Sequence, residues 1–152
     1  MTPEEKLQSL GLSLPELPTP VANYVPFKLA GDMIYLSGQG PRKSDGTYYV
    51  GKVGRDVTVE EAYQHARLTG LGLLAAAKKA AGDLSRIEVI KVFGMVNGVP
   101  EFANQPKVIN GCSDLFVEVL GERGRHARSA IGMGSLPNNM TVEIEAIMRL
   151  VG

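Results

Sequence analysis

Two acidic residues near the C-terminal end of the chain are candidates for proton transfer. Glu143 and Glu145 lie two positions apart in a stretch that alternates apolar and polar residues. Side chains two apart on a β-strand point to the same face, so both carboxylates lie opposite the apolar face. A hydrated strand face is the ordinary interpretation, although glutamate is depleted in strands. If that face is buried against another molecule, at least one carboxylate needs a partner or a chemical role.

A basic cluster precedes this strand and contains a candidate carboxylate-binding group. Arg123, Arg125, His126 and Arg128 follow one another closely. A solvated loop is the ordinary interpretation of such a run, but Arg128 falls at the start of the next predicted strand. An arginine fixed at a strand end presents a planar fork that suits a carboxylate. A small 2-oxo or 2-imino acid is one ligand that would fit.

Other residues give weaker signals. Asn110 is either a polar pocket group or part of a loose helical turn, and Cys112 is expected to be a small, half-buried residue without an adjacent base. The glycine pairs of the chain do not form the G-x-G-x-x-G or P-loop patterns that hold phosphates. His65 and His126 have no metal-ligand spacing, and one cysteine makes a cysteine-based zinc site very unlikely. We therefore expect no metal and no other cofactor.

Composition limits the classes of partner. The 152 residues carry 16 Lys+Arg and 16 Asp+Glu, so the formal charge is zero and nothing draws the whole chain toward nucleic acid. The start of the sequence lacks the apolar run of a signal peptide, and the longest weakly polar run is too short to span a bilayer. We expect a cytoplasmic protein with no nucleic-acid or membrane partner, formed by a single domain over residues 1–152 with an N-terminal helical arm over residues 1–20.

The elements that must position the candidate residues follow from periodicity and from turn signals. A short helix is expected after Thr2 and Pro3, and Thr58-Val59-Glu60-Glu61 forms a capping box at the start of the longest helix. Further signals predict strands over 21–29, 33–39, 87–96, 127–134 and 141–151 and helices over 58–82 and 104–120. This order predicts an α+β two-layer fold with two main helices on one face of a mixed β-sheet. The second face carries apolar residues and is expected to pack against other subunits.

Taken together, several segments resemble a known family. Ser37-Gly38-Gln39-Gly40-Pro41 is similar to an S-G-Q-x-P signature, and Arg128-Ser129-Ala130-Ile131, Leu136-Pro137 and Val142-Glu143-Ile144-Glu145-Ala146 are similar to a C-terminal signature of the Rid family. This family is also called YjgF-type or L-PSP endoribonuclease-like. The resemblance covers nearly the whole chain, which looks like a longer branch of roughly 150 residues.

The resemblance implies a chorismate-mutase-like fold and a homotrimer, in which three sheets form a barrel with clefts between subunits. It also implies hydrolysis of reactive enamine and imine intermediates, such as 2-iminopropanoate and 2-iminobutanoate, to 2-oxo acids and ammonia. Arg128 matches the residue that binds the substrate carboxylate, and Glu143 matches the acid that positions water. The expected substrate-binding residues are Tyr24, Ser37, Gly38, Asn110 and Arg128.

The chain departs from the family pattern near Arg128. Ala130 stands where many members carry cysteine, and Gly132 and Gly134 replace residues that are usually larger. A reshaped cleft is therefore expected, and two other functions stay open. The same cleft could bind a small carboxylate without turnover, as a sensor or regulatory module, or the chain could be an endoribonuclease. Zero net charge and the lack of an aromatic and basic stripe argue against the ribonuclease.

Overall fold

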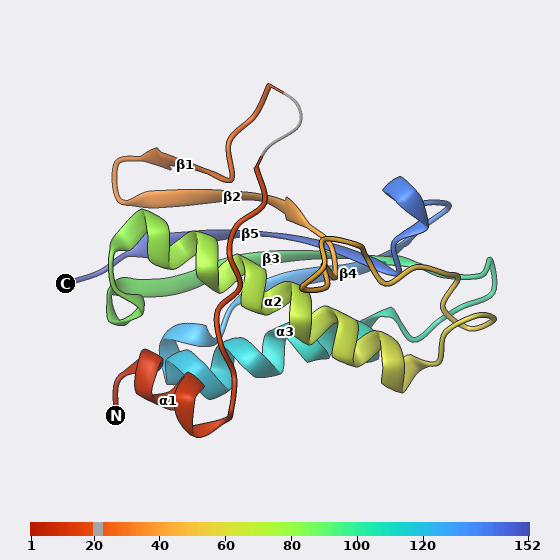
Figure 1. Ribbon diagram of the computed structural model, residues 1–152, viewed down its shortest axis with the longest axis horizontal. Helices are drawn as coiled ribbons and strands as arrows, with labels where there is room; N and C mark the ends of the chain where they lie inside the picture. Colours follow the sequence, from red (N-terminus) through yellow and green to blue (C-terminus); the bar gives the residue numbers. More distant parts are fainter. Residues whose placement is uncertain (20–22) are drawn as a thin grey trace.

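Two long helices pack against one face of a five-stranded sheet in the computed structural model, which describes residues 1–19 and 23–152 (Figure 1). The helices are α1 (Pro3–Ser9), α2 (Val59–Ala81) and α3 (Gln105–Leu120), and the short 3-10 turns are η1 (Leu84–Arg86), η2 (Gly121–Gly124) and η3 (Pro137–Asn139). The strands are β1 (Phe27–Ala30), β2 (Met33–Gln39), β3 (Ile87–Asn97), β4 (Ala127–Met133) and β5 (Val142–Leu150). The predicted α+β architecture is confirmed.

The sheet is mixed, with the order β1-β2-β5-β3-β4. Only the β3–β4 pair is parallel among the strand pairs of the described chain, because α3 carries the chain back to the start of the sheet between these two strands. The other neighbours are antiparallel, and β1 and β2 form a hairpin across Gly31. Glu143 thus lies on β5 and Arg128 on β4, with β3 between these two strands.

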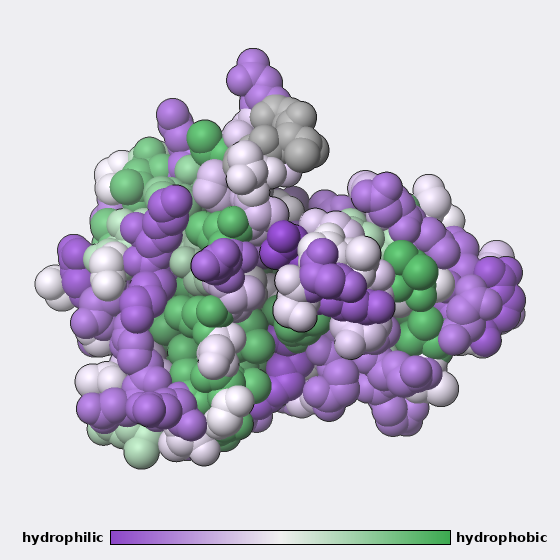
Figure 2. Space-filling model, in the orientation of Figure 1, coloured by the Kyte–Doolittle hydropathy of each residue, from purple (hydrophilic) through white to green (hydrophobic). Residues whose placement is uncertain are grey.

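The core lies between the sheet and the helices. Val142, Ile144, Ala146 and Met148 of β5 are all buried, as their alternation predicts. They meet the alanine- and leucine-rich face of α2 and the apolar face of α3. After α1 the chain runs across α2 toward β1, with Leu12, Leu14 and Leu17 packed against the core, and apolar surface gathers beside this crossing (Figures 1 and 2).

The helix boundaries follow the predicted caps in most places. Thr58 and Glu61 form the expected capping box, and Gly82 and Gly121 end the long helices with positive φ. The helix predicted over 104–120 has its N-cap at Asn104, but the Asn104 side chain makes no capping hydrogen bond. Pro106, in the first turn of α3, has no backbone N–H to offer such a cap.

The first strand is shorter than expected. The prediction of a strand over 21–29 is wrong for residues 23–26, and its residues 21 and 22 lie outside the described chain. Pro26 cannot donate to a β-ladder, so regular pairing begins at Phe27. In the part of the chain that the structure describes, no helix is both long and apolar enough to cross a membrane.

Candidate functional site

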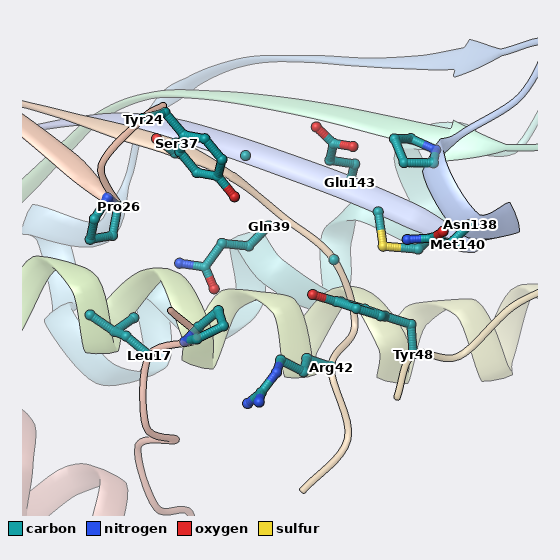
Figure 3. A pocket seen from close by; sticks show the side chains of 14 residues that line it. Leu17, Tyr24, Pro26, Ser37, Gln39, Arg42, Tyr48, Asn138, Met140 and Glu143 are labelled. Atoms are coloured by element: carbon teal, nitrogen blue, oxygen red, sulfur yellow. The ribbon is translucent and has the colours of Figure 1, made fainter. Parts of the chain in front are cut away.

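A cavity of about 470 Å³ opens beside the end of β2 and contains four of the predicted site residues (Figure 3). Tyr24, Ser37, Gly38 and Glu143 all line it. The rest of its wall comes from the segment before β1, from the loop after β2 and from η3, namely Leu17, Pro18, Pro26, Gln39, Gly40, Arg42, Tyr48, Pro137, Asn138 and Met140. The cavity therefore joins segments that are far apart in the sequence.

Glu143 provides the acidic group of this cavity. It pairs with Met95 on the sheet face away from the helices and is half-buried. Burial raises its pKa above the ordinary range, and the nearby negative charge of Glu145 raises it further. Glu145 itself is exposed and does not line the cavity. A carboxylate with a raised pKa is a stronger base once ionised, which suits it to accept a proton from water.

A β-bulge in β2 determines which residues reach Glu143. The register shifts between Leu36 and Gln39, so Gln39 pairs with the buried Ile144 on the helix side of the sheet. Gly38 turns toward Glu143 instead. A Cβ atom added to Gly38 would lie 2.6 Å from Glu143 Oε2, which explains why this position holds glycine.

Ser37 positions the wall of the cavity. Its hydroxyl donates to the Val25 carbonyl (2.5 Å), and its backbone N–H donates to the Pro26 carbonyl (3.0 Å). These bonds attach the segment before β1 to β2, and the ring of Tyr24, 52% exposed, lies at the cavity mouth. The Ser37 hydroxyl is thereby engaged with the backbone, whereas the Tyr24 side chain lines the cavity.

Several cavity residues were not singled out from the sequence as site residues. Gln39 is held by α2, where its Nε2 donates to the Gly72 carbonyl (3.1 Å), and a Cβ atom on Gly72 would lie 2.2 Å from Gln39 Oε1. Asn138 lies in a turn with positive φ. Arg42 and Tyr48 face each other across a short β-bridge. The Pro137-Asn138-Asn139 turn signal could have indicated the position of η3, but no sequence signal shows which way Arg42 and Tyr48 point.

Arg128 lies outside this cavity, on the opposite face of the sheet. Arg128 pairs with the buried Val92 of β3, whereas Glu143 pairs with Met95 of the same strand. Val92 and Met95 are an odd number of positions apart, so the side chains at these two positions point to opposite faces of the sheet. Arg128 Nη1 donates to Ser113 Oγ (3.0 Å), and Nη2 donates to the Pro106 carbonyl (3.3 Å). Both partners lie on α3, so helix and strand together fix the guanidinium.

A short hydrogen-bond chain supports Arg128. His126 Nδ1 lies 2.6 Å from the Gly124 carbonyl, which only accepts, so this nitrogen carries the proton. His126 Nε2 lies 2.9 Å from Ser113 Oγ and can accept its hydroxyl proton. Burial lowers the pKa of His126, and the positive charge of Arg128 lowers it further, although the bond to Gly124 opposes this. A neutral His126 thus orients the Ser113 oxygen toward Arg128.

Asn110 accompanies Arg128 rather than Glu143. It is half-buried and lies three positions before Ser113 on α3, so the two side chains share one helix face. Cys112 points into the core and is fully buried, which raises its thiol pKa and leaves it unreactive. The structure therefore brings together Tyr24, Ser37, Gly38 and Glu143 and leaves Arg128 and Asn110 as a second group.

The described residues contain no cluster of three or more His, Cys, Asp or Glu side chains arranged to bind a metal ion. The first group, around Glu143, contains a half-buried carboxylate in a cavity. The second group, around Arg128, contains an ordered guanidinium beside polar side chains. The first can handle a proton, and the second can bind an anion.

Comparisons with known proteins agree with this architecture. Residues 4–147 match the family described as "YjgF/chorismate_mutase-like, putative endoribonuclease". Protein TCP17 of Trypanosoma cruzi is 40% identical over 146 residues, covering 95% of this chain and 91% of that protein.

Two solved structures are similar over nearly the whole chain. The protein Atu1372 of unknown function from Agrobacterium tumefaciens is 49% identical, with a TM-score of 0.90 and coverage of 98% of this chain and 92% of its own. A protein from Shewanella oneidensis, described as "a putative endoribonuclease", is 36% identical, with a TM-score of 0.95 and coverage of 99% and 100%.

Proposed function

Because the chain belongs to the YjgF/chorismate mutase-like (Rid) family, we propose that it hydrolyses reactive 2-imino acids, with their enamine tautomers, to 2-oxo acids and ammonia. The observation that carries the proposal is the half-buried Glu143 carboxylate, which faces a cavity and has a raised pKa. A base in this setting can activate water against a carbon that is already electrophilic.

The proposed site needs two chains. Arg128 and Glu143 lie on opposite faces of one sheet, so a single protomer does not offer both to one small substrate. We propose a homotrimer in which Arg128 and Asn110 of one chain complete the cavity of a neighbour. Apolar side chains on the helix-free face support this assembly, since Tyr35 and Ile131 are 46% and 42% exposed there.

In the proposed reaction, the guanidinium of Arg128 binds the carboxylate of the substrate and orients the imine carbon toward Glu143. Glu143 accepts a proton from water as the water oxygen bonds to that carbon, while the nitrogen takes up a proton from solvent. The resulting carbinolamine loses ammonia when Glu143 returns its proton to the nitrogen, the carbon–nitrogen bond breaks and the hydroxyl proton passes to solvent. One imine and one water thus give one 2-oxo acid and one ammonia.

The Arg128→Ala variant tests the proposal. Removing one partner of a charge-assisted pair costs about 2–5 kcal/mol, so kcat/KM for freshly generated 2-iminopropanoate should fall about thirtyfold or more. Arg125→Ala is the matched control, because Arg125 is exposed and bonded to Glu122 in the same segment. Equal hydrolysis by the parent and by Arg128→Ala would refute the role of Arg128. Binding of 2-oxo acids without any turnover by the parent would indicate a carboxylate sensor.

A further inference from the structure

The cavity around Glu143 is larger than a small imino acid requires. Its volume of about 470 Å³ lies within the range of ~300–1,000 Å³ that holds drug-sized ligands. The cavity passes over the bulged end of β2, from Glu143 on the helix-free face to Gln39 on the helix side. When the reacting carbon of a substrate lies at Glu143, the helix-side end of the cavity is therefore available to hold the substrate side chain.

Arg42 supplies a positive charge at that end. In Figure 3 the carboxylate of Glu143 and the guanidinium of Arg42 lie at opposite ends of the group, with Gln39 and Tyr48 between them. Arg42 also lines an adjoining groove between α2 and the segment Pro15–Thr19. The cavity is thus acidic at one end and basic at the other.

The backbone that carries Arg42 is fixed. Arg42 and Tyr48 form an antiparallel bridge, the Lys43 N–H donates to the Thr47 carbonyl (2.7 Å), and the Tyr49 N–H donates to the Pro41 carbonyl (3.1 Å). Both bridge residues line the cavity. A preformed hairpin of this kind presents a side chain to a ligand at a small cost in conformational entropy.

The guanidinium of Arg42 can pair with a carboxylate, and it forms no ion pair within the described part of this chain. Over residues 1–19 and 23–152, no carboxylate lies within ion-pair distance of it. Arginine offers several N–H donors in a planar fork that matches a carboxylate. By contrast, the neighbouring Lys43 lies over the ring of Tyr49, 4.6 Å from its centre.

We propose that Arg42 binds an acidic group at the end of the substrate side chain, so that the preferred substrates are 2-imino acids with a second, distal carboxylate. This inference rests on the proposed imine hydrolysis and adds the class of substrate. Arg128 of the neighbouring chain binds the 2-carboxylate, Glu143 acts at the imine carbon, and Gln39, held by Gly72, forms the wall along the side chain. Imines derived from glutamate and aspartate belong to this class.

The test compares imines that amino-acid oxidases generate in place from alanine and from glutamate. The parent should hydrolyse the glutamate-derived imine with about a tenfold or greater advantage in kcat/KM, because a hydrogen bond to a charged group contributes roughly 1.5–3 kcal/mol. Arg42→Gln should reduce this ratio about tenfold. Arg42→Glu should reverse it and favour the alanine-derived imine, because the introduced carboxylate repels the distal carboxylate of the glutamate-derived imine. Lys79→Gln, on the exposed side of α2 and outside the cavity, is the control and should keep the parent ratio.

The outcomes separate the two proposals. If the parent hydrolyses neither imine, the proposed deaminase function fails. If the parent hydrolyses both equally and Arg42→Gln keeps the ratio, the distal site is refuted while imine hydrolysis stands. A parallel loss for both imines in Arg42→Gln would mean that Arg42 binds the 2-carboxylate, which also overturns the assignment. Calorimetric binding of 2-oxoglutarate and pyruvate, which needs no turnover, should show the same ratios.

Discussion

The two groups of candidate residues are built in different ways. The Glu143 group depends on irregular backbone, namely the bulge at Gly38, the turn at Asn138 and the hairpin of Arg42 and Tyr48. The Arg128 group lies on regular elements, with β4 and α3 joined by hydrogen bonds through Ser113. The proposed reacting end of the site can therefore be reshaped through loops, whereas the proposed carboxylate-binding end is fixed by the core of the fold.

The largest expected effect concerns Glu143. Glu143→Gln should lower kcat by about 10²- to 10⁴-fold, the usual contribution of a general acid or base. In the parent, activity should rise with pH through a pKa above the ordinary range for a carboxyl group, because burial and Glu145 disfavour the charged form. The pH–rate profile of the parent should show this rise, and that of Glu143→Gln should lack it.

Glu145→Gln sharpens the same test. Removing this negative charge makes ionisation of Glu143 easier, so the rise in activity should move to lower pH. If activity still rises at the pH of the parent in both Glu143→Gln and Glu145→Gln, a group other than Glu143 titrates.

A smaller effect is expected at Gly38. Gly38→Ala should displace the Glu143 carboxylate, because the added Cβ would lie 2.6 Å from its oxygen. The displaced atom ends a flexible side chain, so the melting temperature should change little while kcat falls about tenfold or more. Gly134→Ala, where a Cβ would meet nothing within 4 Å, is the control. A normal kcat in Gly38→Ala would separate Glu143 from the reaction.

The smallest effect is expected at Ser113, in the Arg128 group. Ser113→Ala removes the oxygen that accepts from Arg128 Nη1, which should raise KM roughly five- to tenfold with a lesser change in kcat. Ser113→Thr keeps the hydroxyl and should restore KM. If the two variants behave alike, the hydroxyl does not position Arg128.

Much of the fold could be predicted from local patterns. The capping box at Thr58 marked α2, and strict alternation marked β5, since both patterns report backbone geometry within a few residues. The predicted strand does not form at residues 23–26, because Pro26 cannot pair in a β-ladder. Gly72 allows α2 to approach the sheet closely at Gln39, whereas Gly70 faces Cys112 and Leu115 of α3.

The site was predictable only where motifs mark it. Glu143 and Arg128 stand in recognisable segments, but the alternation that would place Gln39 fails at the bulge, which reverses the faces of Gly38 and Gln39. Arg42 and Tyr48 lie in a turn-rich segment whose composition does not show which way a side chain points. In the proposed site the relation between Arg128 and Glu143 depends on more than one chain, and no pattern within one sequence specifies it.

The most direct test of the shared site is complementation between two inactive variants. Arg128→Ala and Glu143→Gln chains should each be inactive alone. Co-expressed in equal amounts, they should recover roughly a quarter of the parent activity, because each site of a closed ring takes its two groups from different chains. Recovery in isolated mixed trimers would support the shared site. If mixed trimers form but stay inactive, Arg128 and Glu143 do not act across a subunit boundary, and the account is contradicted.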